Sequence, residues 1–226
     1  MKNILRNKYL SRPRYNRYLT AVGNDNNRAK KLYNANIRLA QSFHPILSQF
    51  EVVLRNSLNN KLSVHFADTD WIINQKNHFM RHGSLSASNF FLRKSVINTE
   101  HSLSRKGIPI TSGKIISDQN LGFWIAFFLP HHYLLVAGQP IHIFPNKPSL
   151  EDRASLYSKL DDIRSFRNRV NHCEPICFNG NHINCNEAID IRNKLYNLIE
   201  WINPDLVPFF KGIDNTQSKI DKIMSI

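Results

Sequence analysis

The sequence predicts an all-α protein. Only 8 glycines and 10 prolines occur among 226 residues, which leaves room for long helices. In several stretches apolar residues recur at spacings of three and four, the period of a helix that is buried on one face. Hydrophobic residues make up 42% of the chain and charged residues 21%, which is typical of a globular protein with a core. At this length we expect one domain over residues 1–226.

The first third of the chain predicts two helices behind a basic N-terminal segment. Residues 1–27 are basic and rich in tyrosine, and part of this segment could be flexible. Apolar positions from Arg28 onward suit a helix that Pro45 should interrupt, because proline lacks the N–H that an interior helical position donates. A second helix, with leucines spaced by three and four, should then run to about Phe66.

The middle of the chain predicts a polar helix and a buried helix, separated by loops. Residues 71–88 form a polar connection rich in serine and histidine. A helix over residues 89–105 should follow, with Ser88 as its cap and Gly107 as its end. Residues 107–117 should form a loop with extended character. Residues 122–129 are apolar all round, which predicts a buried helix.

The last third predicts two more helices. Three prolines between residues 140 and 148 mark a loop. Ser149 and Asp152 resemble a capping box that opens a helix, and Pro175 should end that helix. A last helix should cover residues 186–203. Neither an internal repeat nor a linker is evident, which agrees with a single domain.

The charge of the chain predicts a polyanionic partner. Thirty Lys and Arg residues against 17 Asp and Glu give a formal charge of +13. Because each phosphate that a cation neutralises releases counterions, we expect nucleic acid rather than membrane. A membrane-surface protein would show a basic amphipathic helix or a lipidation motif, and neither is evident. A secretory signal and a spanning apolar run are also not found, so we expect a cytoplasmic protein.

A short run in the second-last predicted helix brings together an arginine and a histidine. Arg167 is followed by the polar Asn168, and His172 comes five positions after the arginine. Arginine can hold a phosphate and stabilise its developing charge, while histidine can transfer protons near neutral pH. A straight helix would not aim Arg167 and His172 at one point, so the long arginine side chain or a distorted last turn must bring them together.

This run and two earlier blocks resemble a bacterial protein family. The early block has Glu51 four positions before Arg55, the central block (residues 116–124) ends in Gly-Phe-Trp, and the closing block (residues 166–176) contains the arginine–histidine run. Together they are similar to the Abi-like family, the abortive-infection AbiD/AbiF type, whose C-terminal part carries the signature of HEPN-domain ribonucleases. The family often has a glutamate before Gly-Phe-Trp, where this chain has Asp118.

The resemblance implies a fold, a reaction and partners. The fold would be a HEPN-like helical bundle with additional N-terminal helices. The reaction would be RNA cleavage without metal or cofactor, in which the 2′-hydroxyl attacks the phosphate and leaves a 2′,3′-cyclic phosphate. Arg167 would clamp the phosphate, Asn168 would position the arginine or the substrate, and His172 would be the acid–base. HEPN nucleases usually pair two motifs in a homodimer, here as a toxin or antiphage effector with an antitoxin or a phage-derived trigger.

Four more polar residues are candidates for supporting roles. Glu51 and Arg55 are i,i+4 partners at the edge of an apolar stripe, so they should be partly buried. By family similarity Glu51 could orient the motif residues or activate the 2′-hydroxyl, and a purely structural ion pair is the alternative. Asn171 and Glu174 flank His172. Glu174 could orient the imidazole or serve only as a polar residue at the helix end.

Four residues near the motif have side chains that zinc prefers, namely Cys173, Cys177, His182 and Cys185. Their spacing is irregular, and three cysteines do not make a disulfide framework. Ordinary reduced thiols in a loop are the alternative to a zinc site.

Two other functions stay open on the sequence. The chain could be a non-catalytic module that binds RNA or a protein partner, or a toxin component silenced by a separate antitoxin. Both need the same basic surface. Nucleotide hydrolysis, proteolysis and ester hydrolysis lack support, because we find no Gly-rich phosphate loop, His-Glu-x-x-His or Gly-x-Ser-x-Gly motif.

Overall fold

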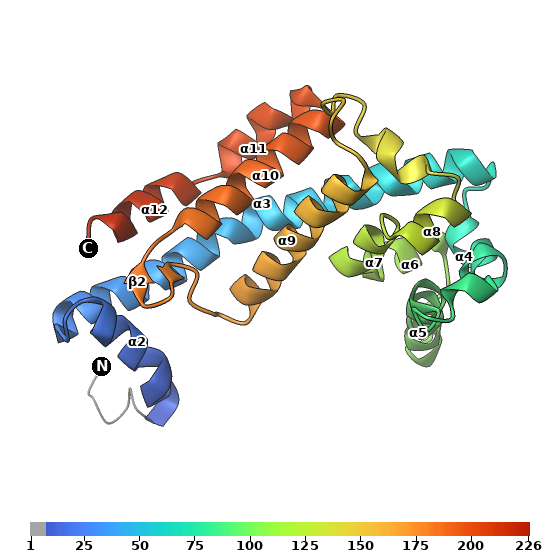
Figure 1. Cartoon of the computed structure of the whole chain (residues 1–226). Coiled ribbons are helices and arrows are strands. Elements are labelled where there is room, and N and C mark those ends of the chain that lie inside the picture. Colours follow the sequence, from blue (N-terminus) through green and yellow to red (C-terminus); the bar gives the residue numbers. More distant parts are fainter. Residues whose placement is uncertain (1–7) are drawn as a thin grey trace. The chain divides into compact units, whose positions relative to one another are not determined.

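The computed structural model describes residues 8–226, whose regular secondary structure is helical apart from one antiparallel strand pair (Figure 1). The prediction of an all-α protein is confirmed. The strands are β1 (Phe178–Asn179) and β2 (His182–Ile183). Of the basic segment 1–27, residues 1–7 lie outside the described residues, and α2 (Arg12–Ala21) occupies much of the rest. No helix in the described part is long and apolar enough to span a membrane.

The chain forms two compact units, and the long helix α3 (Asn26–Phe66) contributes to both. The first unit holds the chain up to Ser48 together with Ser165–Tyr196 and Asp205–Ile226. The second holds Gln49–Arg164 and Asn197–Pro204. The expected single domain therefore stays a prediction.

The first unit combines the two ends of the chain. It contains α2, the first part of α3, the end of α9 (Arg153–Asn171), most of α10 (Asn186–Ile202), α11 (Val207–Ile213) and α12 (Thr216–Met224). Its core includes the edge-to-face pair Phe43 and Phe166, whose ring centroids lie 4.8 Å apart. Tyr18 of α2 packs edge-to-face on Phe178, with centroids 5.1 Å apart. This contact joins the N-terminal helix to the segment after α9.

The second unit surrounds a buried aromatic cluster. Trp71 and Phe123 both meet the ring of Phe127 edge-on, at centroid distances of 5.9 and 5.7 Å. Its elements are the second part of α3, the start of α9, α4 (Trp71–Asn74), η1 (Gln75–Asn77), η2 (Phe79–Arg81), η3 (Gly83–Leu85), α5 (Phe91–Arg105), α6 (Ser112–Asp118), α7 (Leu121–Ala126), α8 (Pro130–Leu135), η4 (Gln139–Ile143) and η5 (Pro204–Leu206), which continues into the first unit.

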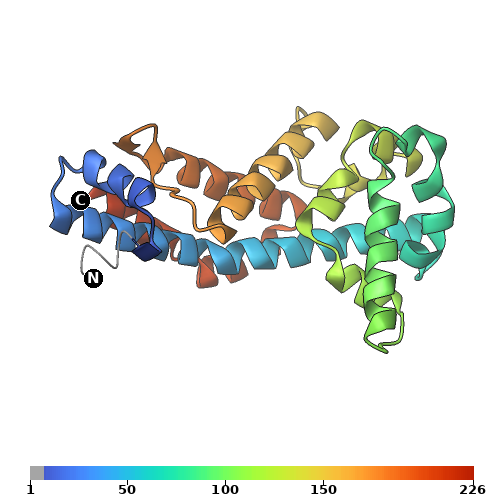
Figure 2. The same cartoon turned by 90° about the horizontal axis from the view of Figure 1, so that it is seen from below.

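Pro45 does not interrupt α3, contrary to the prediction. The helix continues through it as one element (Figure 1 and Figure 2). The proline removes the hydrogen bond that would reach the carbonyl of Gln41. Both residues are exposed, so water can satisfy that carbonyl. Side chains on either side of the proline, including Phe43 and Leu47, are buried in the core, which favours the helical conformation on both sides.

Two loop predictions and the position of the last helix were also wrong. The connection over residues 71–88 contains short helices, because its few apolar residues are buried as anchors. The expected extended stretch after Gly107 forms α6, which Thr111 caps by accepting the N–H of Lys114 at 3.4 Å. The helix over residues 186–203 is confirmed as α10 but is not the last, since α11 and α12 follow.

Of the two predicted ends of α5, one is confirmed and the other was wrong. Gly107 ends the helix as predicted, with a positive φ of 63° and its N–H bonded to the carbonyl of Ser104 at 3.0 Å. Ser88 is not the cap, because its hydroxyl donates to the carbonyl of Leu85. The helix begins after Phe90, which has a left-handed conformation.

Candidate functional site

Helix α9, which carries the motif, begins with a reciprocal cap. The N–H of Ser155 donates to the Asp152 carboxylate at 2.8 Å, and the N–H of Asp152 donates to the Ser155 hydroxyl at 2.9 Å. The N–H of Ser155 also lowers the pKa of Asp152. A capping box is therefore present, but it pairs Asp152 with Ser155, and the predicted pairing of Ser149 with Asp152 was wrong.

The other end of α9 has the hydrogen bonds of a Schellman motif. The N–H of Glu174 reaches the carbonyl of Arg169 at 2.9 Å, and the N–H of Cys173 reaches that of Val170 at 3.1 Å. Cys173 lies in the left-handed region, with a φ of 53°. Glycine is the usual residue at this position. The helix thus ends at Asn171, before Pro175, and the expected end at Pro175 was wrong.

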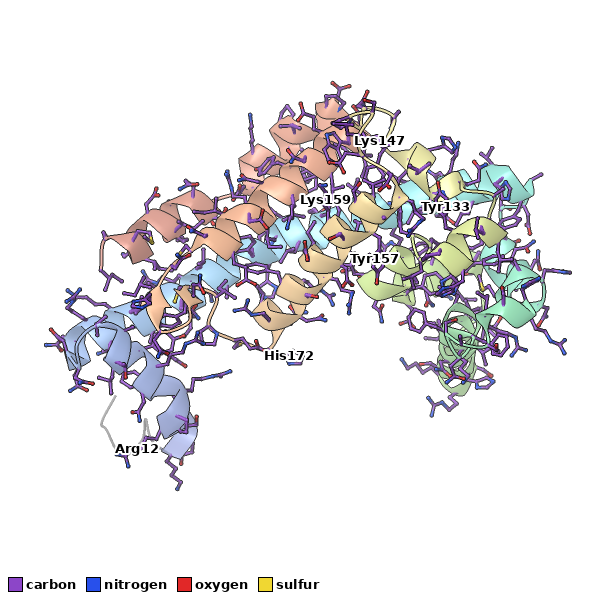
Figure 3. All side chains as sticks on the ribbon, in the orientation of Figure 1. Arg12, Tyr133, Lys147, Tyr157, Lys159 and His172 are labelled. Atoms are coloured by element: carbon purple, nitrogen blue, oxygen red, sulfur yellow. The ribbon has the colours of Figure 1, made fainter. Side chains whose placement is uncertain are left out.

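The motif residues lie on the last turns of this helix and directly after it. Arg167 and Asn168 are half-buried, whereas Asn171 and His172 are exposed. His172 still follows the helical path, because its N–H donates to the carbonyl of Asn168 at 2.9 Å. Figure 3 shows His172 at the end of α9. A polymer can approach an exposed histidine at a helix end without any opening of the fold.

The segment after His172 is anchored from two sides. Buried Asn36 of α3 accepts the N–H of Ile176 with its side-chain oxygen at 2.9 Å. Arg169 donates to the carbonyl of Pro175 at 2.7 Å. Both bonds fix the chain within four residues of His172. No local sequence pattern signals the contact of Asn36 with Ile176, because the two residues are 140 positions apart.

Glu174 pairs with an arginine of α9. Its carboxylate lies 3.4 Å from Nε of Arg169, which also pairs with Glu187 of α10. Glu174 is about half exposed, so this pair contributes little to stability by itself. The contact places the carboxylate beside the helix end, and an effect of Glu174 on the imidazole stays a prediction.

Helix α2 brings cations to the same end of α9. Arg14 donates from Nη2 to the main-chain oxygen of His172 at 3.4 Å. Arg17 donates to the carbonyl of Gly180 at 2.7 Å, and its guanidinium lies 4.7 Å from the ring centroid of Phe178. Arg14 is therefore a site residue that the motif search missed. The cluster of arginines in the N-terminal segment was the available signal.

Glu51 and Arg55 lie on α3 in the second unit. Both are half-buried, as predicted. Arg55 donates to the carbonyl of Ser117 in α6 at 3.4 Å, and its Nε is buried without a hydrogen-bond partner among the described residues. An approach of Glu51 to the motif residues stays a prediction.

The Gly-Phe-Trp block has a packing role in the second unit. Phe123 and Trp124 are fully buried. A Cβ at Gly122 would lie 3.2 Å from the side-chain oxygen of Asn120, which caps α7 by accepting the N–H of Phe123. The nearby Asp118 accepts the hydroxyl of Thr99 at 2.7 Å.

The cysteines do not form the zinc site considered from the sequence. Cys173 is exposed, whereas Cys177 and Cys185 are buried. Burial raises the pKa of Cys177 to about 12 and that of Cys185 to about 11, so both stay as neutral thiols. In the described part of the chain, no three His, Cys, Asp or Glu side chains are grouped so that they could hold a metal ion.

Comparison with known proteins found no family model, no curated protein and no solved structure that matches the chain. The similarity to the Abi-like family therefore rests on the sequence motifs and stays a prediction.

Proposed function

We propose that the protein is a metal-independent endoribonuclease of the HEPN type, with Arg167, Asn168 and His172 as its catalytic residues. The observation that carries the proposal is the exposed His172 at the end of α9, with Arg167 on the preceding turns. Arg14 adds a second guanidinium beside the same helix end. An imidazole that transfers protons and a guanidinium that holds the phosphate suffice for RNA cleavage without metal.

The proposed reaction moves two protons. The 2′-oxygen of the ribose attacks the adjacent phosphorus in line, and the bond from phosphorus to the 5′-oxygen breaks. The 2′-hydroxyl loses a proton, and the leaving 5′-oxygen gains one. In a homodimer, His172 and His172 of the partner subunit could share these steps, one as base and one as acid. Arg167 would stabilise the charge that builds on the phosphate oxygens.

The biological role that fits this reaction is that of a toxin or antiphage effector. The partners would be RNA, a second copy of the chain, and an antitoxin or phage-derived trigger that controls the activity. The net charge of +13 supports an RNA substrate, since many phosphates can be neutralised. The proposed location is the cytoplasm, where RNA is available.

Incubation of the purified protein with total RNA in EDTA tests the proposal. We expect fragments with 2′,3′-cyclic phosphate and 5′-hydroxyl ends, which His172→Ala should abolish while the circular dichroism spectrum stays unchanged. Retarded RNA without fragments would instead assign the protein as a non-catalytic RNA-binding module. Fragments with 3′-hydroxyl ends, or cleavage only with added magnesium, would contradict the proposed reaction.

A further inference from the structure

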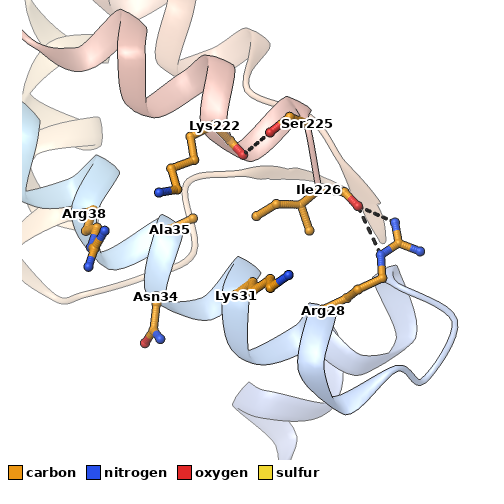
Figure 4. Close-up of a pocket in the computed structure, with 8 residues that line it drawn as sticks. All are labelled: Arg28, Lys31, Asn34, Ala35, Arg38, Lys222, Ser225 and Ile226. Atoms are coloured by element: carbon orange, nitrogen blue, oxygen red, sulfur yellow. Dashed lines mark hydrogen bonds between the residues drawn. The ribbon is translucent and has the colours of Figure 1, made fainter.

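Two hollows in the first unit lie next to each other between α3 and α12, with Arg38 lining both. The first has a volume of about 610 Å³ and is lined by Arg28, Lys31, Arg38 and Lys222 (Figure 4). The second has about 370 Å³ and shares Arg38, while Lys219 adds a further cation. We call the two hollows together the α3–α12 groove. Figure 4 shows Lys222 reaching from α12 toward α3 across the first hollow.

The positive charge of the α3–α12 groove is partly compensated near Arg28, which donates from Nε and Nη2 to Ile226, and stays uncompensated elsewhere along the lining. None of the described residues that line the two hollows is Asp or Glu. Arg28 donates from Nε to the main-chain oxygen of Ile226 at 3.1 Å. The carboxylate of Asp25 is engaged by main-chain N–H groups of Arg28 and Asn27, which lower its pKa, and the charges of Arg28 and Lys31 add to this effect. Lys219, Lys222 and Arg38 therefore leave a positive potential in the groove.

The groove is long enough for a strand rather than a single phosphate. Its lining runs along α3 from Arg28 to Pro45, which is a helix rise of about 26 Å. Proteins that bind single-stranded nucleic acid hold roughly 4–16 nucleotides per domain in such positively charged grooves. None of the described lining residues is aromatic, so the groove offers no surface on which bases could stack. Contacts would therefore be made to phosphates, without preference for sequence.

We propose that the α3–α12 groove binds the phosphate backbone of single-stranded RNA outside the cleavage site. The identity of the ligand as the substrate strand rests on the proposed function. A mononucleotide fits less well, because such ligands are usually enclosed in pockets lined by apolar and aromatic side chains. A membrane also fits less well, since a helix that lies on a bilayer presents an apolar face to it, and here the cations line a hollow.

The groove and the motif share one helix. Asn36, which holds the chain after His172, lies on α3 between Lys31 and Arg38. A strand bound along α3 would thus be held by the same element that positions the segment after His172. The groove should raise the affinity for long RNA and leave the chemical step unchanged.

Charge reversal at two groove positions tests the inference. Arg38→Glu with Lys222→Glu removes two cations of the groove, and neither side chain is a proposed catalytic group. Lys30→Glu with Lys106→Glu is the matched control, because both lysines are exposed, line neither hollow and change the net charge equally. Binding is measured with a 2′-O-methyl RNA of roughly 16 nucleotides, which lacks the attacking hydroxyl. The salt range is about 50–200 mM.

We expect the groove variant to bind at least about tenfold more weakly than the control. Its log–log salt slope should be shallower by about 1.4, since each phosphate contact on a single strand contributes about 0.7. Equal affinity and slope in the two variants would overturn the inference. The inference would also be overturned if the groove variant lost binding to phosphatidylserine vesicles while its RNA binding stayed unchanged. If the reversed variant does not fold, Arg38→Gln with Lys222→Gln replaces it, against Lys30→Gln with Lys106→Gln.

The outcomes separate this inference from the proposed function. A wild-type protein that binds RNA through the groove but does not cut it would refute the ribonuclease and leave the groove inference standing. A protein that cuts RNA, but whose groove variant binds like the control, would refute only the groove.

Discussion

The side-chain oxygen of Asn36 accepts the main-chain N–H of Ile176 at 2.9 Å, across 140 positions of the chain. Asn36 is 3% exposed and Ile176 is 1% exposed, so the bond is shielded from solvent. The contact ties the helix α3 to the segment that follows His172. It makes Asn36 a positioning residue rather than a catalytic one.

Asn36→Ala should therefore destabilise the fold and disturb the site. An unsatisfied buried N–H costs about 1–3 kcal/mol. We expect the urea unfolding free energy to fall by that amount, and RNA cleavage to fall while the protein is still folded. The exposed Asn60→Ala on the same helix is the control and should change neither quantity. Loss of stability with full cleavage activity would show that the bond supports only the fold.

Cys173→Gly should stabilise the protein. Cys173 has a φ of 53° at the end of α9, where a left-handed conformation costs a residue with a side chain about 1 kcal/mol. Glycine removes that cost, so thermal unfolding should occur at a higher temperature. Ser158→Gly in the middle of α9 is the comparison and should destabilise slightly, by roughly 0.5 kcal/mol. If both substitutions destabilise equally, the left-handed turn carries no strain.

Helices could be predicted from the sequence where the segment's own residues show the pattern of a buried helix. The buried α7 and the end of α5 at Gly107 are examples. Pro45 misled the prediction, because its local cost is outweighed by buried neighbours such as Phe43 that only the folded chain provides. Short helices such as α6 were not predicted for a related reason. The sequence pattern of α6 is weak, and the burial of Ile115 in the folded chain stabilises the helix.

Of the candidate site, too, one part could be predicted from the sequence and another part could not. Its motif is local, so Arg167 and His172 could be proposed from the sequence. The contact of Arg14 with His172 spans 158 positions and has no local signature. The turn at Cys173 could not be predicted either, because glycine is the residue that normally marks such a helix end.

Buried His132 should make the second unit sensitive to acid. Its Nδ1 lies 2.9 Å from the carbonyl oxygen of Ala126, and the residue is fully buried. Burial, with a smaller effect of His131, lowers the pKa of His132 to about 4. In the unfolded chain the pKa is about 6.5, so the unfolded state binds more protons between these values. The stabilisation is therefore complete above pH 6.5 and is lost as the pH falls toward 4.

The loss can reach about 3 kcal/mol, since one pKa unit corresponds to about 1.4 kcal/mol. Urea unfolding at about pH 7 and pH 5 measures most of it, in a range above the titration of most carboxylates. His132→Gln should flatten this dependence, whereas His44→Gln, at an exposed position, should leave it unchanged. A wild-type protein equally stable at both values would contradict the neutral buried imidazole.

Arg167→Lys should lose most of the cleavage activity although the charge is kept. A guanidinium can hold two phosphate oxygens in a planar fork, whereas the lysine ammonium is a compact and strongly hydrated point charge. These contacts strengthen as charge develops in the transition state, and the loss of one such donor typically slows a reaction by about 10²–10³. The rate is measured in single-turnover reactions at saturating protein, with the melting temperature as the check of folding. Arg55→Lys, on α3 in the second unit, is the comparison and should slow cleavage less, because Arg55 is expected only to support Glu51. Cleavage by Arg167→Lys as fast as wild type would make the arginine structural, and the catalytic cation would then have to be sought elsewhere, with Arg14 as the first position to test.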